Sequence, residues 1–495
     1  MRVAYDSLVK QNNRLNFSSD IIQTTHYYLK FFVSSAEDYD LLVADSLDLY
    51  EYPLDYEIES YGDYFMSEED GQKGKWYYTV VPKDYEFGKI EYEILEDLFM
   101  EYGLKNERTS QEFLDFYYQL EDESLKLTGL LPENNSDENL RMPPRRHPSG
   151  TLRVRNTETN TLDPVVGVKV KTRRLVKLGH GWTNGAGNYT VNKSYRYDVH
   201  YSVSFENQSG FKVWNTLLDV NPANFNGPKQ NRDGWSYNFD TNSFGWRFAT
   251  VTNAVRRYFV HASAFGIGLP HSNLRIAALD RTGSSSAPML RRVWGINGFT
   301  TNSGFANFLL KANGISLNIN LIATVTKFVQ PDLIIAAGVG NGTEEIYSDT
   351  FHELAHASHM RQAGSAYWIK YINYIITYAD YLPVNNNGAY GNGTGKNAEI
   401  CGIGEMWGNY FSAVCMNREI PATGGIGEYL WETEDWYNPG FLLDVDNIPD
   451  VSTQEIFSSL QPSITTFPQL INQLKTKTNN NGQVDNAFSN YTDWP

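Results

Sequence analysis

The stretch Thr350-Phe351-His352-Glu353-Leu354-Ala355-His356-Ala357-Ser358-His359 carries the most informative pattern in this chain of 495 residues, a His-Glu-x-x-His motif. A helix is predicted around it, because Asn341 suits a helix N-cap and Gly364 suits a helix end. Residues four apart lie on the same face of a helix, about 5–6 Å from each other. The imidazoles of His352 and His356 can therefore converge on one metal ion.

Glu353 follows the first histidine of the motif and is the predicted catalytic residue. Its carboxylate can act as a general base that takes a proton from a water attacking a carbonyl group. A catalytic zinc ion has three protein ligands, so the two histidines need a further partner. The segment 397–411 is predicted to be helical and offers Glu399 and Glu405. His359 lies one turn beyond the motif and is expected behind the ligands or at the surface.

The segment Glu405-Met406-Trp407-Gly408-Asn409-Tyr410-Phe411 resembles the Glu-Gly-Phe-Ala-Ser-Tyr-Phe stretch of thermolysin-like aminopeptidases. Together with the His-Glu-x-x-His motif, it makes the chain similar to the gluzincin zinc metallopeptidases. The resemblance implies that His352, His356 and Glu405 bind Zn²⁺. Glu399 stays the alternative third ligand, and a solvated or helix-capping role is its other interpretation.

The same resemblance suggests roles for residues around the ligands. Gly408 stands where a small residue lets two helices pack closely, and Asn409 stands where a second-shell acid steadies a histidine ligand. The Gly-x-Met-Glu-Asn motif that binds a substrate amine is absent, since residues 336–340 read Ala-Ala-Gly-Val-Gly, so aminopeptidase specificity is not implied. Gluzincins usually add a Tyr or His that stabilises the oxyanion. The candidates for this role are Tyr390, Tyr429 and Tyr437.

Charge is distributed unevenly along the chain. Residues 1–140 contain 11 Lys and Arg against 31 Asp and Glu, a net charge of −20, whereas the whole chain carries −17. A negative chain of this kind is not expected to bind nucleic acid. We expect residues 1–140 to form an acidic, mixed α/β accessory module, followed by a proline-rich linker at 141–150. Within the module, strands are predicted at 27–33 and 75–81 and helices at 90–98 and 113–120.

The remaining chain is predicted to contain two further domains, so the expected fold class is multidomain α+β. Residues 151–215 are predicted to be all-β, and the sequence Gly167-Val168-Lys169-Val170, with the later Gly187-Asn188-Tyr189, resembles the small β-sandwich of carboxypeptidase regulatory-like domains. Residues 216–495 are expected to form a zincin-like α+β catalytic domain. Its predicted features are a surface loop at 221–245, buried strands at 274–279 and 333–339, and binding of the substrate backbone at the edge of the second strand.

The location of the protein is predicted from a further resemblance. Residues 50–57 and 76–82 are similar to the leading domain of bacterial cell-surface proteins that combine a β-sandwich with a zinc-protease motif. This implies an extracellular or cell-surface protein, with an export signal of the lipid-anchor type upstream of Met1. No stretch is apolar enough to span a membrane, because the longest apolar run covers only residues 333–339.

The expected function is zinc-dependent hydrolysis of peptide bonds in proteins or peptides, glycosylated ones included, at the bacterial cell surface. The alternative is a non-catalytic surface protein that binds glycan or protein and has a structural or vestigial zinc site, a reading that rests on the 14% aromatic content. A zinc hydrolase acting on a non-peptide bond is a third interpretation. Glu353 favours catalysis, because a structural site needs no carboxylate between its histidine ligands.

Overall fold

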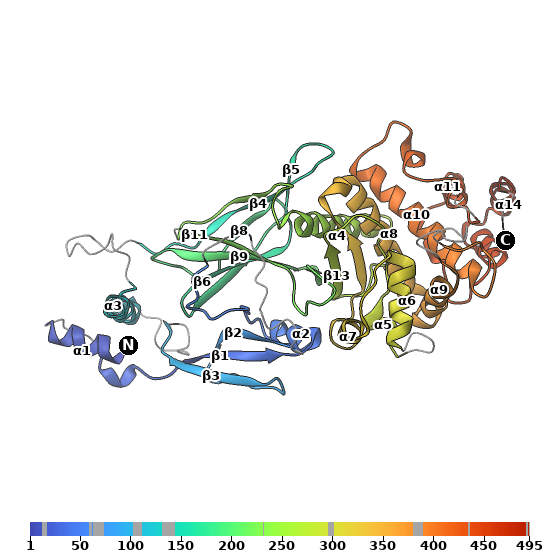
Figure 1. The fold of residues 1–495 in the computed structure, drawn as a ribbon. Coiled ribbons are helices and arrows are strands. Elements are labelled where there is room, and N and C mark those ends of the chain that lie inside the picture. Colours follow the sequence, from blue (N-terminus) through green and yellow to red (C-terminus); the bar gives the residue numbers. More distant parts are fainter. Residues whose placement is uncertain are drawn as a thin grey trace.

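A computed structural model describes residues 1–11, 17–58, 62, 74–101, 111–130, 144–230, 232–295, 301–379, 390–433, 436–491 and 494. The protein is a multidomain α+β structure, as predicted. Figure 1 shows the N-terminal module at one end and under the β-rich middle of the molecule, and a layer of helices at the other end. No helix in the described part of the chain is long and apolar enough to cross a membrane.

The N-terminal module contains a three-stranded antiparallel sheet in the order β2-β1-β3. β1 (His26–Val33) and β2 (Lys75–Pro82) confirm the two predicted strands. The helix predicted at 90–98 is wrong, because Tyr92–Leu98 forms β3 and pairs with the second edge of β1. Its apolar spacing suited a helix, but most of β3 is exposed, and pairing with β1 decided the conformation.

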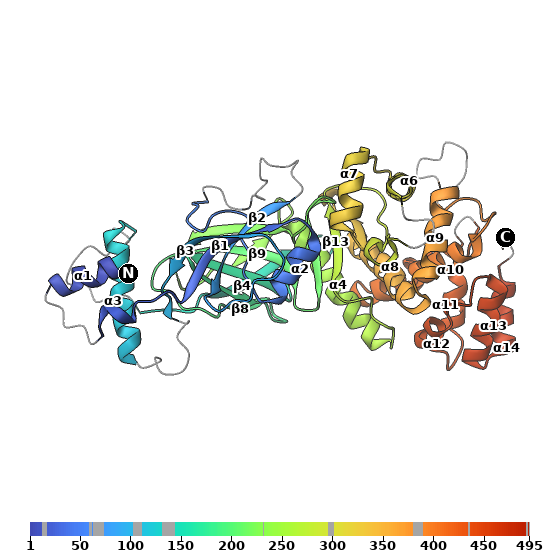
Figure 2. The same ribbon diagram turned by 90° about the horizontal axis from the view of Figure 1, so that it is seen from below.

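Helices complete the module. α2 (Ala36–Ala44) follows β1, and its N-terminus is capped by the side chain of Ser35. The helix predicted at 113–120 is confirmed within α3 (Gln111–Leu127), which packs against α1 (Arg2–Lys10). Figure 2 shows this helix pair beyond the end of the three-stranded sheet. Residues 141–143 of the predicted linker lie outside the described residues, and Ser149 and Gly150 already belong to a strand.

A seven-stranded sheet forms the middle of the molecule, in the order β14-β13-β10-β9-β6-β7, with β11 also paired to β9. Its strands are β6 (Val168–Arg174), β7 (Lys177–Trp182), β9 (Val199–Asn207), β10 (Phe211–Trp214), β11 (Asn224–Gln230), β13 (Leu274–Leu279) and β14 (Leu333–Ala336). β10, β13 and β14 are parallel to one another, and the other pairs are antiparallel. Residues 151–215 therefore share one sheet with strands from beyond residue 216, two ranges that the predicted division had separated.

A four-stranded sheet packs beside it, with the order β12-β4-β5 and β8 paired to β4. The strands are β4 (Ser149–Arg155), β5 (Leu162–Pro164), β8 (Asn188–Thr190) and β12 (Tyr237–Phe239). The surface loop predicted at 221–245 is wrong, because it contains β11 and β12. Trp235 and Phe239 are buried in the common core, with the Phe225 ring stacked parallel to Trp235. The glycine and asparagine content indicated a loop, but aromatic burial outweighed it.

Helices after residue 245 form a layer at the β13–β14 end of the large sheet, with the first of them against the strands and the last four farthest from the sheet (Figures 1 and 2). They are α4 (Trp246–Ala264), α5 (Leu290–Val293), α6 (Asn302–Asn313), α7 (Ile319–Thr324), α8 (Gly342–Ala363), α9 (Ser365–Tyr378), α10 (Ala398–Glu419), α11 (Gly440–Asp446), α12 (Thr453–Ser458), α13 (Phe467–Thr478) and α14 (Asn481–Ser489). The helix predicted at 341–364 is confirmed as α8, which contacts α4, α9, α10 and β14. α8 is therefore the central helix of this layer.

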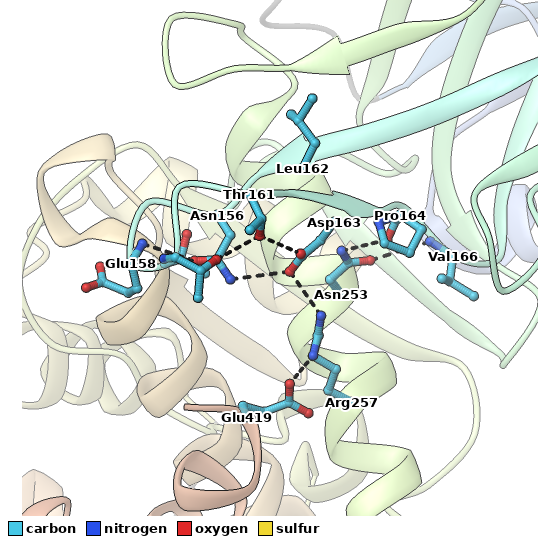
Figure 3. A network of polar contacts seen from close by, with 12 residues as sticks. Asn156, Glu158, Thr161, Leu162, Asp163, Pro164, Val166, Asn253, Arg257 and Glu419 are labelled. Atoms are coloured by element: carbon cyan, nitrogen blue, oxygen red, sulfur yellow. Dashed lines mark hydrogen bonds and ion pairs between the residues drawn. The ribbon is translucent and has the colours of Figure 1, made fainter. Parts of the chain in front are cut away.

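A polar network joins the helical layer to the small sheet (Figure 3). Asp163 in β5 forms an ion pair with Arg257 of α4 at 3.0 Å, and Arg257 also pairs with Glu419 at the end of α10. Asn253 of α4 donates to the carbonyl of Pro164 at 2.9 Å. Three elements far apart in the sequence are thus held together by charged side chains.

The acidic module docks on the large sheet through buried ion pairs. Lys169 of β6 is almost fully buried, and its Nζ lies 2.9 Å from Asp48 and 3.1 Å from Glu206. The guanidinium of Arg275 in β13 contacts Glu37 at 2.7 Å and Asp40 at 2.9 Å. The negative charge of the module is therefore partly matched by basic residues that the sheet buries beneath it.

Candidate metal centre

Three potential metal ligands meet between α8 and α10. Nε2 of His352 lies 3.3 Å from one carboxylate oxygen of Glu405, and Nε2 of His356 lies 3.4 Å from the other. The ligand atoms of all three residues lie within 4.8 Å of one another. Two ligands held at about 2.0–2.1 Å from a shared tetrahedral ion are themselves about 3.3–3.4 Å apart. The His352, His356 and Glu405 side chains are therefore spaced as a group that could hold one metal ion.

The two helices approach closely because α10 carries glycine opposite the motif. A Cβ atom on Gly408 would lie 2.8 Å from Cε1 of His352 and 3.0 Å from Cε1 of His356, both too short for carbon atoms. Glycine inside a helix costs about 1 kcal/mol relative to alanine. Gly408 offsets this cost by leaving room for both imidazoles, in agreement with its expected role. One residue earlier, the indole of Trp407 donates to the carbonyl of Ala355 at 3.1 Å and fixes the helices against each other.

The environment of Glu405 fits a bound cation. Its side chain is fully buried, and no Lys or Arg in the described part of the chain forms an ion pair with it. Tyr371 of α9 donates its hydroxyl to one carboxylate oxygen, whereas the other oxygen makes no hydrogen bond of good geometry. Burial of a carboxylate is costly unless it is paired or coordinates a metal. Two histidines and one glutamate are ligands that zinc favours, so the residues present fit such an ion.

The charge states of Glu405 and His356 suit coordination. Burial disfavours ionisation of Glu405, but the nearby imidazoles of His356 and His352 outweigh it and lower the pKa of this carboxyl. Burial lowers the pKa of His356, so its imidazole stays neutral near pH 7. An ionised glutamate and a neutral imidazole are the forms in which these side chains bind metals. Burial lowers the pKa of His352, but Glu405, Glu353 and Asp349 outweigh it and raise this pKa to about 9, so a metal ion would displace a proton there.

Glu353 is the carboxylate next to the ligand group on α8. It follows His352 on α8, is buried, and lines the same small cavity as the three ligands. Burial raises the pKa of Glu353 to about 8, against the opposing effect of His352. Asp349, one turn earlier, accepts a hydrogen bond from Ser285 at 2.6 Å, and burial raises its pKa to about 6. A carboxylate that readily takes up a proton therefore lies beside the ligands.

The other residues considered from the sequence lie elsewhere. Glu399 accepts a hydrogen bond from the backbone N–H of Phe467 and caps α13, so it is not part of the ligand group. His359 is fully buried rather than at the surface, and its ring packs 5.2 Å from that of Tyr367. Burial lowers the pKa of His359 to about 3. In the described part of the chain, Asn409 makes no hydrogen bond with either ligand histidine.

The tyrosines that lie near the metal ligands could not be identified from the sequence. Of the three candidates for the oxyanion role, Tyr390 lines the cavity, and Tyr429 donates to the carbonyl of Ile420. Tyr371, which contacts Glu405, was not among them. Its ring is stacked on Trp368 with centroids 4.3 Å apart, and a Cβ on Gly404 would press on that ring. No local pattern separates Tyr371 from the other tyrosines of α9, because only packing against α10 gives it this contact.

The prediction that a substrate binds along the edge of β14 is wrong, because another segment of the chain occupies this edge. Ser286 exchanges two backbone hydrogen bonds of 2.9 Å with Ile334, and Ser285 Oγ accepts from the N–H of Ala336. The edge of β14, predicted to bind substrate, is thus already covered by the segment 284–287, which itself lines the cavity. The cavity measures about 40 Å³, enough for a few water molecules. A larger substrate would have to lie across its mouth.

Comparison of the chain with known protein families and with curated proteins finds no match. The assignment of function therefore depends on the geometry of the His352, His356, Glu405 and Glu353 side chains.

Proposed function

We propose that the protein is a zinc-dependent hydrolase of peptide bonds, in which His352, His356 and Glu405 hold Zn²⁺ and Glu353 acts as general base. The observation that carries the proposal is the buried Glu353 carboxylate in the cavity of a His-His-Glu ligand group. A metal that only stabilises the fold gains nothing from this carboxylate, whose burial is costly. A hydrolytic site needs such a group to accept a proton.

Each residue of the site has a separate role in the proposed reaction. Zinc, when bound, supplies a Lewis acid that polarises a carbonyl group and makes water more acidic. Glu353 accepts a proton from the attacking water on its carboxylate and then delivers it to the nitrogen of the departing amine. Tyr371 keeps the Glu405 carboxylate oriented toward the two histidines through its hydrogen bond.

The segment 284–287 is the proposed contact for the substrate backbone. Ser286 uses its backbone N–H and C=O for Ile334, and successive residues of an extended strand direct these groups to opposite sides. In the described structure the backbone N–H and C=O of Ser285 make no backbone hydrogen bond. They are thus available for an extended peptide, which would add to this segment instead of to β14.

The wider setting is part of the same proposal. We take the substrate to be a protein or peptide at the bacterial cell surface, glycosylated ones included, and the enzyme to be of the gluzincin type, exported with a lipid anchor. This rests on the sequence resemblances given above. The competing proposal is a surface binding protein with a structural metal site, and a non-peptide substrate remains a third outcome.

A cleavage screen with one matched pair of variants tests the proposal. Purified protein, Glu353→Gln and Glu399→Gln are each incubated with a mixture of denatured proteins, and new peptide ends are identified by mass spectrometry. Glu353→Gln should bind metal fully but lose at least about 10²-fold in turnover, the effect of removing a general base. Glu399→Gln should keep activity, because Glu399 caps α13 outside the metal site.

Two results would contradict the proposal. Unchanged turnover in Glu353→Gln would show that this residue is not the base. Full metal content without any cleavage by the unmodified chain would favour the binding protein, and cleavage of an ester or glycosidic model substrate alone would favour the non-peptide hydrolase.

A further inference from the structure

A groove of about 620 Å³ lies away from the metal centre, where the C-terminal halves of α4 and α8 meet the turn between β9 and β10. α4 and α8 pack side by side in both ribbon views (Figures 1 and 2). The groove is lined by Arg256, His271 and Arg361, by serines, and by apolar residues that include Phe259 and Val260. Among the described residues no Asp or Glu lines it. In a chain of net charge −17, this is a locally positive concave surface.

Arg256 is held in the groove without a carboxylate partner. Its Nη1 donates to the hydroxyl of Ser209, and in the described part of the chain it forms no ion pair. Its Nε is buried and has no hydrogen-bond acceptor. A buried N–H without an acceptor costs free energy. Arginine presents its N–H groups in a fork that fits an oxyanion, and the part of the Arg256 guanidinium that lines the groove could donate to one.

Arg361 in the last turn of α8 also forms no ion pair in the described part of the chain. It donates to the carbonyls of Leu269 at 2.9 Å and Pro270 at 3.0 Å, contacts that orient the guanidinium but leave its charge unbalanced. His271 experiences this positive field. Burial lowers its pKa, and the charges of Arg292 and Arg361 lower it further. The groove thus gathers donors from three segments around one space.

The neighbour of Arg256 shows what a structural arginine looks like in this helix. Arg257 is bound by Asp163 and Glu419, so its charge is neutralised within the chain (Figure 3). Arg256 and Arg361 have no such partners in the described structure. This difference between consecutive residues of one helix indicates that the positive charge of the groove is available to a bound anion.

We propose that this groove binds a phosphate or sulfate monoester of a small organic molecule. Its tetrahedral oxyanion would lie between Arg256 and Arg361, and its organic part on Phe259 and the exposed Val260. Two guanidinium groups, an imidazole and serine hydroxyls offer more donors than a planar carboxylate can accept. A volume of about 620 Å³ is in the usual range of small-molecule sites. The site is independent of the metal and of the hydrolysis proposed above.

Calorimetric titration of the full chain tests this inference. The probes are phenyl phosphate, phenyl sulfate, inorganic phosphate and benzoate, each at low and at moderate salt. At least one ester should bind saturably, more tightly than inorganic phosphate because of the apolar contact, and more weakly as salt is added. The two esters distinguish phosphate from sulfate as the natural group. Benzoate binding as tightly as the better ester would overturn the proposal, as would the absence of saturable binding by both esters.

Variants locate the binding. Arg256→Gln and Arg361→Gln should each weaken ester binding by about tenfold or more, because each removes a charged donor. Val260→Glu places a negative charge at an exposed helix position, so it should abolish binding while the chain stays folded. Arg153→Gln, an exposed arginine of β4 outside the groove, is the control and should change nothing. Equal loss in the control, or full binding in Val260→Glu, would show that the esters do not bind in this groove.

Discussion

Buried carboxylates lie both at the docking surface, where Asp48, Glu37 and Asp40 of the acidic module meet Lys169 and Arg275 of the large sheet, and at the metal centre. The two regions differ in what neutralises the negative charge. Under the module, Asp48 is paired with Lys169 at 2.9 Å and with His180 at 2.9 Å. At the metal centre, Glu405 is equally buried and has only two imidazoles and a tyrosine hydroxyl around it. The docking surface contains its own cation, whereas the His352, His356 and Glu405 group could hold a metal ion from solution.

The docking surface and the candidate metal centre should therefore respond differently when one partner is removed. In the docking surface, removing one partner leaves an uncompensated buried charge, so stability is what changes. In the candidate metal centre, a bound metal would be the positive charge, so we expect the metal content to change first when a ligand is removed. The predictions below test this contrast, beginning with the largest expected effect.

Removal of a ligand should eliminate metal binding. The unmodified chain should carry about one equivalent of metal, as zinc sites normally do, and His356→Ala and Glu405→Ala should carry almost none. Mass spectrometric metal analysis after dialysis measures this. Glu399→Ala is the matched control and should keep its metal, because Glu399 caps α13. Full metal content in Glu405→Ala together with loss in Glu399→Ala would reassign the third ligand.

Breaking the buried ion pair should cost stability without affecting metal. Asp48→Asn removes the charge that faces Lys169 and His180, and the loss of one partner of a buried pair costs about 3–5 kcal/mol. Urea unfolding followed by circular dichroism measures the change. Glu93→Gln breaks the exposed pair with Lys30 and should cost less than about 1 kcal/mol. Equal effects of the two variants would contradict the structural role of the docking surface.

The docking surface should weaken in acid. Burial opposes ionisation of Asp40, Asp48 and Glu101, but facing lysines, arginines and His180 outweigh it and lower the pKa of each. Their stabilising contribution is therefore complete above the pKa of the unfolded chain, about 4, and is lost as the pH falls through the lower folded values. Urea midpoints measured from pH 7 to pH 3 should fall in the acid range, and less steeply in Asp48→Asn. A midpoint that rises below pH 4 would refute this assignment.

A smaller effect is expected from Tyr371→Phe. The hydroxyl orients the Glu405 carboxylate, and loss of a group that orients a metal ligand weakens metal binding about 10- to 100-fold. Competition with a chelator measures the affinity. Tyr367→Phe, one turn earlier on α9, removes a buried hydroxyl that has no hydrogen-bond partner in the described structure and should leave the affinity unchanged. Equal affinities in both variants would remove Tyr371 from the metal centre.

Local patterns were sufficient for the metal-binding helix. The stop at Gly364 and the spacing of His352 and His356 act within a few turns of one helix, and α8 has the predicted extent, although the Asn341 side chain donates to the carbonyl of Ala336 instead of capping the helix. Local patterns did not predict β3, because Ile94 and Leu98 follow a helical spacing although the segment forms a strand. There the unpaired edge of β1, distant in sequence, decided the conformation.

The sequence by itself determined the chemistry that is available: two imidazoles and a carboxylate on one helix, and two downstream glutamates as further ligands. Only the tertiary structure decided between Glu405 and Glu399, because six residues along α10 direct one side chain to α8 and the other to the start of α13. It also placed the Tyr371 hydroxyl on Glu405 and covered β14 with residues 284–287. Among the described residues it gave Arg257 two ion pairs and Arg256 none. Two residues on one helix share a face because of local periodicity, as His352 and His356 do. Contacts between different helices and strands depend on how the whole chain packs.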